Sequence, residues 1–198
     1  MGLAELQEAL ARLSIDPVFR DRFFTDPTTT GGTLGLSGSE SQSLAQISKR
    51  QIEQFAESLA RKRRDQVRRA IPITARILGD RFAELFARYV NDSAPRGSAA
   101  DLDDAVEFVA AISRRPDGIE PPWSVDLARY ELAWRQAARA GRVLRARRFR
   151  FAVARLATGE EPDPVLPRTT LAFWWRLSRR APVGHLVFSL PGPRRLRK

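Results

Sequence analysis

The chain has 198 residues, 43% of them hydrophobic, and a formal net charge of +11, which suits one large or two small globular domains. It contains no cysteine and one histidine. Disulfides, thiolate metal sites and cysteine nucleophiles are therefore excluded, and zinc and most iron sites lack their usual ligands. We expect no catalytic residues, no metal ligands and no cofactor in this chain.

The positive charge is concentrated towards the C-terminus. Residues 142–198 contain 14 Lys/Arg and 3 Asp/Glu, whereas residues 1–60 have a balance of −3 and residues 61–141 of +3. Of the 34 basic residues 31 are arginine, a skew that a GC-rich genome also produces. A basic module behind a nearly neutral body predicts a surface for an acidic or extended ligand.

No targeting or membrane segment is expected. The first residues, MGLAELQEALARL, lack the basic and apolar regions of a signal peptide. No apolar run approaches the roughly 18 residues that a membrane span needs. The sequence therefore predicts a cytoplasmic protein.

Residues 1–47 are predicted to form a helical module. Leucines recur at three- and four-residue spacing over residues 3–13, which indicates an amphipathic helix. Asp16-Pro17 begins a second helix, because proline is favoured at the first helical position. Residues 26–32 are predicted to be a loop. Ser37 begins a capping box (Ser-x-x-Glu) that starts a further helix.

Residues 48–141 are predicted to form a second helical domain. Its first helix is capped by Ser48, packs through Ile52, Phe55, Leu59 and Val67, and ends at a break caused by Pro72. A single helix then runs to about Tyr89, followed by a linker over residues 91–99.

Two more helices complete this domain. Asp101, Asp103 and Asp104 open the first, where negative charge stabilises a helix N-terminus. This cluster lacks the glycine and terminal glutamate of a calcium loop, so we interpret it as helix capping. The second begins at Ser124 or Asp126 and ends near residue 141.

Residues 142–190 are predicted to form a basic β-containing module. The segment RVLRARRFRF favours a strand, and apolar residues alternate over residues 169–177 and 183–190, which predicts a β-hairpin with a basic turn. His185 lies inside a predicted strand and is interpreted as structural. The tail, residues 191–198, is predicted to be disordered. The expected fold is α+β, a mostly α-helical body of six or seven helices followed by a small hairpin or sheet.

Adjacent tryptophans in the hairpin point to opposite faces of the sheet, so one of them belongs to the core. Trp174 shares its face with Arg176, and an aromatic ring beside a guanidinium is typical of a binding hot spot. The alternative packs Trp174 against the helical body. The candidate peptide-binding residues are Trp174, Arg176, Arg179, Arg180, Arg148 and Arg150.

A second basic feature is the run from Arg61 to Arg69, which contains six Lys/Arg. It is either a solvated helix face or a contact surface for a protein partner or nucleic acid. The candidate contact residues are Lys62, Arg63, Arg64, Arg68 and Arg69.

Two motif groups resemble a known family. The first is an aromatic, basic helix followed by apolar-Pro, Leu-Gly and aromatic positions: Phe55, Leu59, Val67, Ile71-Pro72, Leu78-Gly79, Phe82, Leu85 and Tyr89. The second is Asp-Leu-Ala-Arg-Tyr-Glu at residues 126–131. Together they resemble the HvfC/MbnC-like partner subunits of multinuclear non-heme iron oxidative enzymes over residues 50–190. The N-terminal module, especially its segments DPVFRDRFFTDP and LGLSGSESQSLAQI, resembles the small α subunit of ring-opening dioxygenases.

The resemblance implies a non-catalytic role. Such partner subunits bind an iron-dependent oxidative enzyme of TIM-barrel fold and help it to engage a ribosomally synthesised precursor peptide, which is oxidatively modified. Their β module helps to hold the leader peptide by strand addition. Because the family has also been given a DNA-binding label, the alternative function is a nucleic-acid-binding regulator that uses the basic helix at residues 61–69 and the basic tail. A scaffold without further ligands is a third interpretation.

Overall fold

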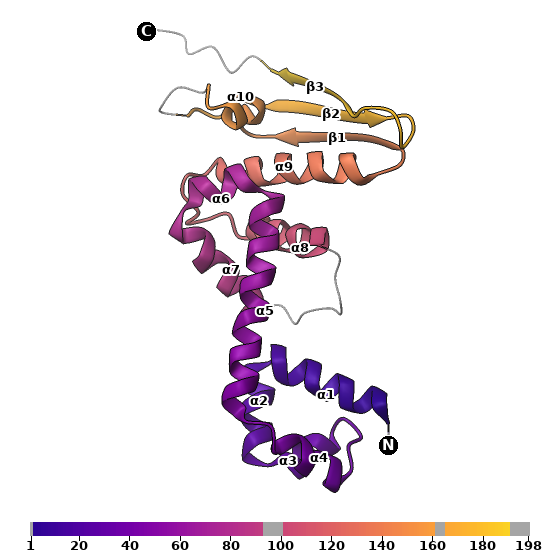
Figure 1. Cartoon of the computed structure of the whole chain (residues 1–198). Coiled ribbons are helices and arrows are strands. Elements are labelled where there is room, and N and C mark those ends of the chain that lie inside the picture. The colour runs from indigo at the N-terminus through magenta and orange to yellow at the C-terminus, as the bar shows by residue number, and fades with distance from the viewer. Residues whose placement is uncertain (1, 93–100, 161–164, 191–198) are drawn as a thin grey trace. The chain divides into compact units, whose positions relative to one another are not determined.

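The computed structural model describes residues 2–92, 101–160 and 165–190 (Figure 1). Within these ranges the chain forms ten helices and three strands, which confirms the predicted α+β fold. The helices are α1 (Leu3–Ile15), α2 (Pro17–Thr25), α3 (Pro27–Gly32), α4 (Gly38–Ala45), α5 (Lys49–Ala70), α6 (Pro72–Leu78), α7 (Asp80–Asp92), α8 (Asp101–Arg114), α9 (Ser124–Arg139) and α10 (Val153–Thr158). The strands are β1 (Val143–Phe149), β2 (Thr170–Arg176) and β3 (Gly184–Ser189). None of the helices in the described ranges has the length and apolar character of a membrane span.

The chain divides into two compact units. Residues 1–63 and 90–97 form the first, and residues 64–89 and 98–198 form the second, so the division falls within α5. The domain limits at residues 47/48 and 141/142 stay predictions. The predicted linker lies largely outside the described residues, as does the whole predicted disordered tail.

The first unit contains α1 to α4 and the N-terminal part of α5. Its core is formed by Ala9, Leu13, Phe19, Phe23, Leu36, Leu44 and Ile52. The predicted capping box is confirmed, because Ser37 accepts from the Glu40 amide while the Glu40 side chain accepts from the Ser37 amide. Phe55, which the helical spacing placed on the packed side of α5, is 60% exposed, so that prediction is wrong.

The predicted loop at residues 26–32 is instead a short helix, α3. Asp26 caps it by accepting a hydrogen bond from the Thr29 amide at 3.1 Å, and Pro27 occupies its first turn. The same Asp-Pro arrangement begins α2 at Asp16. An Asp-Pro pair supplies both the cap and a helical φ angle, which outweighs the weak helix propensity of the threonines that follow.

Two breaks shape the helices at the start of the second unit. The predicted break at Pro72 is confirmed, since α5 ends at Ala70 and α6 begins at the proline. The helix predicted to continue to Tyr89 is wrong, because it is divided into α6 and α7 at Gly79. This glycine has φ 55° and ψ −130°, a conformation that side chains disfavour and glycine permits.

Helix α9 organises the second unit. Helices α6, α8 and α10 and strands β1 and β2 all pack against it. Its inward side chains include Leu127, Tyr130, Ala133 and Ala137, which join a core cluster with residues of the sheet and of α10. The sheet and α9 thus form two layers of one compact unit.

The three strands form one antiparallel sheet in the order β1-β2-β3. The predicted hairpin is confirmed as β2 and β3, and the predicted strand in RVLRARRFRF is β1. Trp174 pairs with Arg145 on one side and His185 on the other. The short helix α10, which ends at Thr158 and is capped by Gly159 with φ 74°, was not predicted.

Candidate peptide-binding sheet

Asp126 holds the end of β1 against α9. Its Oδ2 accepts hydrogen bonds from the backbone amides of Arg150 at 2.5 Å and Phe151 at 3.3 Å. Its Oδ1 accepts from Arg129 at 2.9 Å. Because the Asp126 side chain is largely buried, these bonds satisfy a carboxylate that would otherwise be costly to bury. The first residue of the Asp-Leu-Ala-Arg-Tyr-Glu motif is therefore a structural support for the sheet.

Glu131 of α9 caps the N-terminus of α6. One carboxylate oxygen accepts from the Ile73 amide at 2.8 Å, and the other from the amide and hydroxyl of Thr74 at 2.8 and 2.7 Å. Burial raises the pKa of Glu131, and the bonds from Thr74 and Ile73 oppose that rise. The last motif residue thus satisfies two amides at a helix N-terminus, which have no partner inside the helix.

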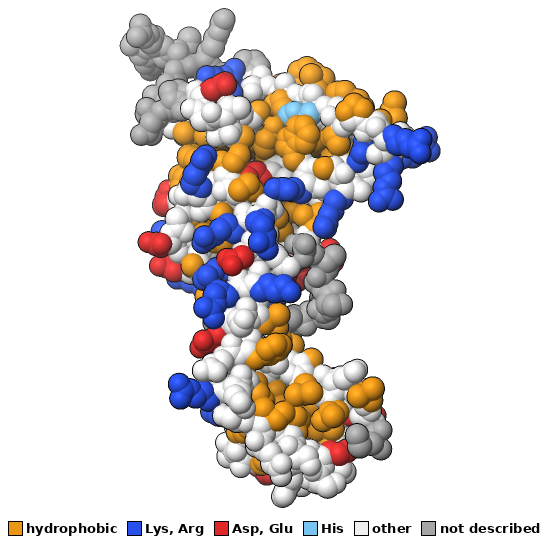
Figure 2. Space-filling view, in the orientation of Figure 1, with side chains coloured by type: hydrophobic (Ala, Val, Ile, Leu, Met, Phe, Trp, Pro, Cys, Tyr) orange, Lys and Arg blue, Asp and Glu red, His pale blue; other side chains and the backbone are white. Residues whose placement is uncertain are grey.

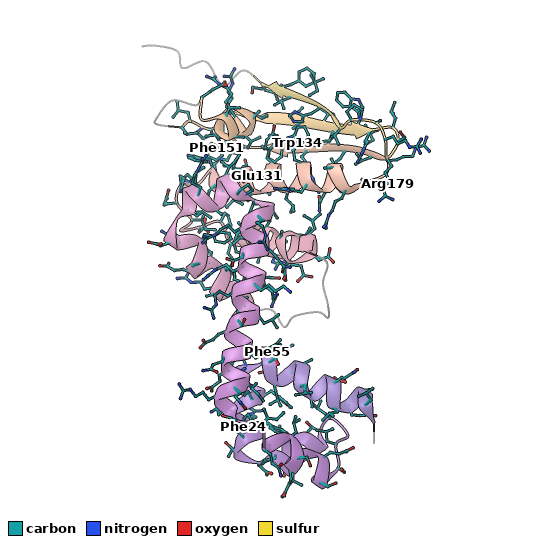
Figure 3. All side chains as sticks on the ribbon, in the orientation of Figure 1. Phe24, Phe55, Glu131, Trp134, Phe151 and Arg179 are labelled. Atoms are coloured by element: carbon teal, nitrogen blue, oxygen red, sulfur yellow. The ribbon has the colours of Figure 1, made fainter. Side chains whose placement is uncertain are left out.

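Trp174 belongs to the core, so its prediction as a peptide contact is wrong. Its side chain is fully buried on the inner face of the sheet, and its ring centroid lies 5.6 Å from that of Tyr130 and 6.5 Å from that of Trp134, which is labelled in Figure 3. Both of these neighbours belong to α9. Strand alternation places residues 170, 172 and 174 together on the covered face of β2, and α9 supplies the apolar cover.

Arg176 is occupied in stabilising the backbone. Its guanidinium donates to the carbonyl oxygens of Ala138, Ala140, Ala181 and Arg179. The first two acceptors lie at the C-terminal end of α9, where a cation is favoured, and the other two lie in the β2–β3 turn. Arg176 therefore ties this turn to α9 and does not offer a free guanidinium to a ligand.

The other predicted peptide-contact arginines are exposed but lie at different ends of the sheet. Arg179 and Arg180 are in the β2–β3 turn, where Figure 3 labels Arg179. Arg148 lies near the far end of β1, paired with Leu171. Arg150 follows β1, with its guanidinium 5.7 Å from the ring centroid of Phe151. These four arginines border the sheet rather than form one cluster.

The outer face of the sheet, on the side away from α9, was not predicted from the sequence as a binding surface. By strand pairing and alternation it consists of Gly184 and eight larger residues: Leu144, Ala146, Arg148, Leu171, Phe173, Trp175, Leu186 and Phe188. The exposed fractions are 86% for Leu144, 39% for Trp175 and 50% for Phe188. Phe173 and Phe188 form an edge-to-face pair with centroids 6.1 Å apart. The alternation of large apolar residues at 171, 173 and 175 was the available signal, but it also fits a buried face.

Strand β3 has a free edge within the described residues. Its neighbour in the sheet is β2 alone, and the Leu190 amide donates to the Thr169 carbonyl at 2.9 Å. Because hydrogen-bonded residues alternate along an antiparallel pair, residues 184, 186 and 188 face β2 with their backbone groups. The amides and carbonyls of His185, Val187 and Ser189 consequently point to the free edge.

The side chain of His185, a residue of this edge strand, contacts α9. Its Nε2 lies 3.3 Å from the Tyr130 hydroxyl, and its ring is 4.7 Å from that of Trp134. Figure 2 shows hydrophobic side chains gathered around the single histidine. Burial lowers the pKa of His185, so the neutral ring is favoured among these aromatic neighbours. The free edge of β3 is thus flanked by apolar surface.

The predicted contact residues on α5 have different surroundings. Lys62 is exposed and Arg63 half-buried in the first unit. In the second unit, Arg64 is half-buried, Arg69 is exposed, and the guanidinium of Arg68 lies 5.7 Å from the ring centroid of Phe82. Exposed cations thus remain in both units.

No group of three or more potential metal-ligating His, Asp or Glu side chains occurs in the part of the chain that the structure describes. The carboxylates of Asp126 and Glu131 accept hydrogen bonds from backbone amides and therefore have structural roles. The arrangement at the sheet is suited to binding an extended chain, since it combines a free strand edge with apolar and basic surroundings.

One family of known proteins is similar to part of this chain. Residues 45–114, about a third of the sequence, match the model of the SCO6045-like, C-terminal domain family. The match covers α5 to α8 and ends before the sheet. No curated protein and no solved structure matches the chain. The candidate site therefore lies outside the matched segment.

Proposed function

We propose that this chain is a non-catalytic partner subunit that binds a ribosomally synthesised precursor peptide and presents it to an iron-dependent oxidative enzyme of TIM-barrel fold. The observation that carries the proposal is the free edge of β3, flanked by apolar side chains and by the arginine-containing turn. The resemblance of the helical segment and of the motif at residues 126–131 to HvfC/MbnC-like partner subunits supplies the identity of the enzyme.

In this proposal the peptide adds a fourth strand beside β3. Backbone groups of His185, Val187 and Ser189 form the hydrogen bonds, which give affinity without sequence specificity. Alternate peptide side chains then lie beside Leu186 and Phe188 on one face and beside His185 on the other. An acidic peptide residue near the turn is attracted to Arg179 and Arg180.

In this proposal the enzyme and this chain have different tasks. The enzyme supplies the iron and the oxidative chemistry, and this chain supplies peptide binding and orientation. Holding the peptide beside the enzyme raises its local concentration at the reactive site, which accelerates the reaction without any catalytic group in this chain.

The first test is co-purification at moderate salt with the product of any adjacent gene that encodes a TIM-barrel iron enzyme. A stable complex is expected. Binding of the precursor peptide from the same gene cluster is then measured by fluorescence anisotropy. Failure to form the complex, together with failure to bind the peptide, would overturn the proposal.

The strand-addition mode has a sharper test in Val187→Pro. Proline removes the amide that points to the free edge while leaving the bonds between β2 and β3, as edge strands permit. We expect peptide affinity to fall at least about tenfold, which is the loss of roughly one hydrogen bond at about 1.4 kcal/mol. Val187→Ala is the matched control, since it removes the same side chain and keeps the amide. Equal affinities of the two variants would contradict strand addition.

The alternative function, a nucleic-acid-binding regulator, is favoured by the exposed cations of α5, such as Lys62 and Arg69, and by the basic sequence of residues 191–198, which lies outside the described residues. Salt dependence distinguishes it. Nucleic-acid binding through six or more phosphate contacts should weaken by about three decades between low and moderate salt. Strand addition, which depends on backbone hydrogen bonds and apolar contacts, should weaken far less.

A further inference from the structure

We propose that the outer face of the sheet is a docking surface for a protein partner, and that it binds an amphipathic helix whose apolar stripe ends in acidic residues. This inference does not depend on the proposed function, because it concerns the face of the sheet and not the edge of β3. Large apolar side chains lie on this face of the sheet, and none of the described elements of the second unit covers them.

The exposure of this face is unusual for a solvated sheet. The inner face is covered by α9, and an antiparallel sheet with one covered face normally presents polar residues on the other. Here seven of the eight outer-face residues other than Gly184 are apolar, and Leu144 is 86% exposed. Contiguous apolar surface of this kind is typical of a protein-binding site.

The dimensions of the face suit one helix. Neighbouring strands lie about 4.8 Å apart, so three strands span about 10 Å, which is close to the diameter of a helix with its side chains. A seven-residue strand such as β1 extends over about 23 Å, which corresponds to about four helical turns. A partner helix of about 15 residues would therefore complete an α-β-α arrangement.

The charges at the ends of the face determine the partner's chemistry. Arg148 lies near one end of the outer face, and Arg179 and Arg180 lie in the turn at the other. Residues 142–190 contain three acidic residues, Glu160, Glu161 and Asp163, which all lie between α10 and β2, and none in the strands or in the β2–β3 turn. A helix with acidic residues in its first and last turns is electrostatically complementary to this surface. A second copy of this chain would instead bring these arginines together, which disfavours self-association through the face.

The experiment uses the full chain and two synthetic helical peptides. Both have 16 residues and one leucine stripe, and the terminal turns carry glutamates in one peptide and lysines in the other. Fluorescence anisotropy is expected to give at least tenfold tighter binding of the glutamate peptide. Leu144→Asp should weaken that binding at least tenfold, and because Leu144 is so exposed the variant should keep its cooperative melt.

Charge reversal provides the matched comparison. Arg179→Glu with Arg180→Glu should reduce or invert the preference between the two peptides. Arg76→Glu with Arg88→Glu is the control, since it makes the same charge change at exposed positions of α6 and α7 and should leave the preference unchanged.

Three results would overturn the proposal. Equal binding of the two peptides would remove the electrostatic argument. Loss of glutamate-peptide binding in Val187→Pro, with none in Leu144→Asp, would place the peptide at the edge of β3. Sedimentation of the wild-type chain as a dimer that Leu144→Asp converts to a monomer would identify a second copy as the occupant.

Discussion

The indole of Trp175 lies directly over the backbone of Gly184 on the neighbouring strand. A Cβ atom at Gly184 would come within 2.1 Å of Cε2 of this indole, closer than any real contact. The two residues are opposite each other in the register of β2 and β3. A tryptophan that covers a glycine in an edge strand shields the backbone and fills the space that a side chain would occupy. The position of Trp175 on the outer face thus depends on the absence of a side chain at Gly184.

Gly184→Ala should displace Trp175 from the outer face. Because the added methyl group collides with a ring, we expect a loss of about 1–3 kcal/mol in the free energy of unfolding and a change in tryptophan fluorescence. Denaturant titration and emission spectra measure the two effects. Gly141→Ala is the matched control, since no atom lies within 4 Å of a Cβ at that position. An unchanged spectrum in Gly184→Ala would contradict the packing described.

Trp174→Ala and Trp175→Ala should differ strongly in stability. Trp174 is fully buried against α9, so its truncation leaves a cavity that costs about 3–5 kcal/mol of the free energy of unfolding. Trp175 is 39% exposed and its truncation should cost clearly less. Urea unfolding of the two variants checks the order. If Trp175→Ala were the more destabilising variant, Trp175 rather than Trp174 would lie on the covered face of the sheet.

Asp126→Ala should destabilise the junction between β1 and α10. The substitution leaves the amides of Arg150 and Phe151 without their acceptor, at an expected cost of about 1–3 kcal/mol in the free energy of unfolding. Hydrogen exchange of these two amides should increase by more than that of amides in α8. Uniform exchange across the second unit would mean that the carboxylate has no local role.

His185 should make stability depend on pH. Burial lowers the pKa of His185 below its usual 6.5, so the unfolded chain binds a proton more readily than the folded one as the pH falls below that value. The free energy of unfolding should therefore decrease as the pH falls from 6.5, and this contribution should be absent in His185→Gln. Chemical unfolding of both proteins over this range measures the difference. Parallel pH profiles would show that His185 does not titrate differently on folding.

The sequence predicted the β module because its signals are local. Alternation over residues 169–177 and 183–190 specifies two strands, and the turn between them specifies a hairpin. The choice of the buried face could not be made in the same way. Both faces of β2 carry a tryptophan, and the position of α9, a non-local feature, determines that Trp174 is covered while Trp175 is not.

The roles of Asp126 and Glu131, the two carboxylates of the motif, also could not be predicted from local sequence patterns. Asp126 binds an amide 24 residues away, and Glu131 binds one 57 residues away. Their spacing on α9 indicates nothing about these partners. The missed helix α3 and the break at Gly79 have another cause, since short helices depend on capping and backbone conformation rather than on apolar periodicity.

The hydrogen bonds of Arg176 to the end of α9 limit how the protein can be divided into fragments. The β2–β3 turn receives part of its support from carbonyl oxygens of Ala138 and Ala140, which precede β1 in the chain. A fragment that starts at residue 142 would lose these acceptors together with the helix that covers Trp174. Its sheet would then expose apolar side chains on both sides, so the fragment would aggregate. Helix α9 and the sheet must therefore be kept together when a minimal binding fragment is prepared.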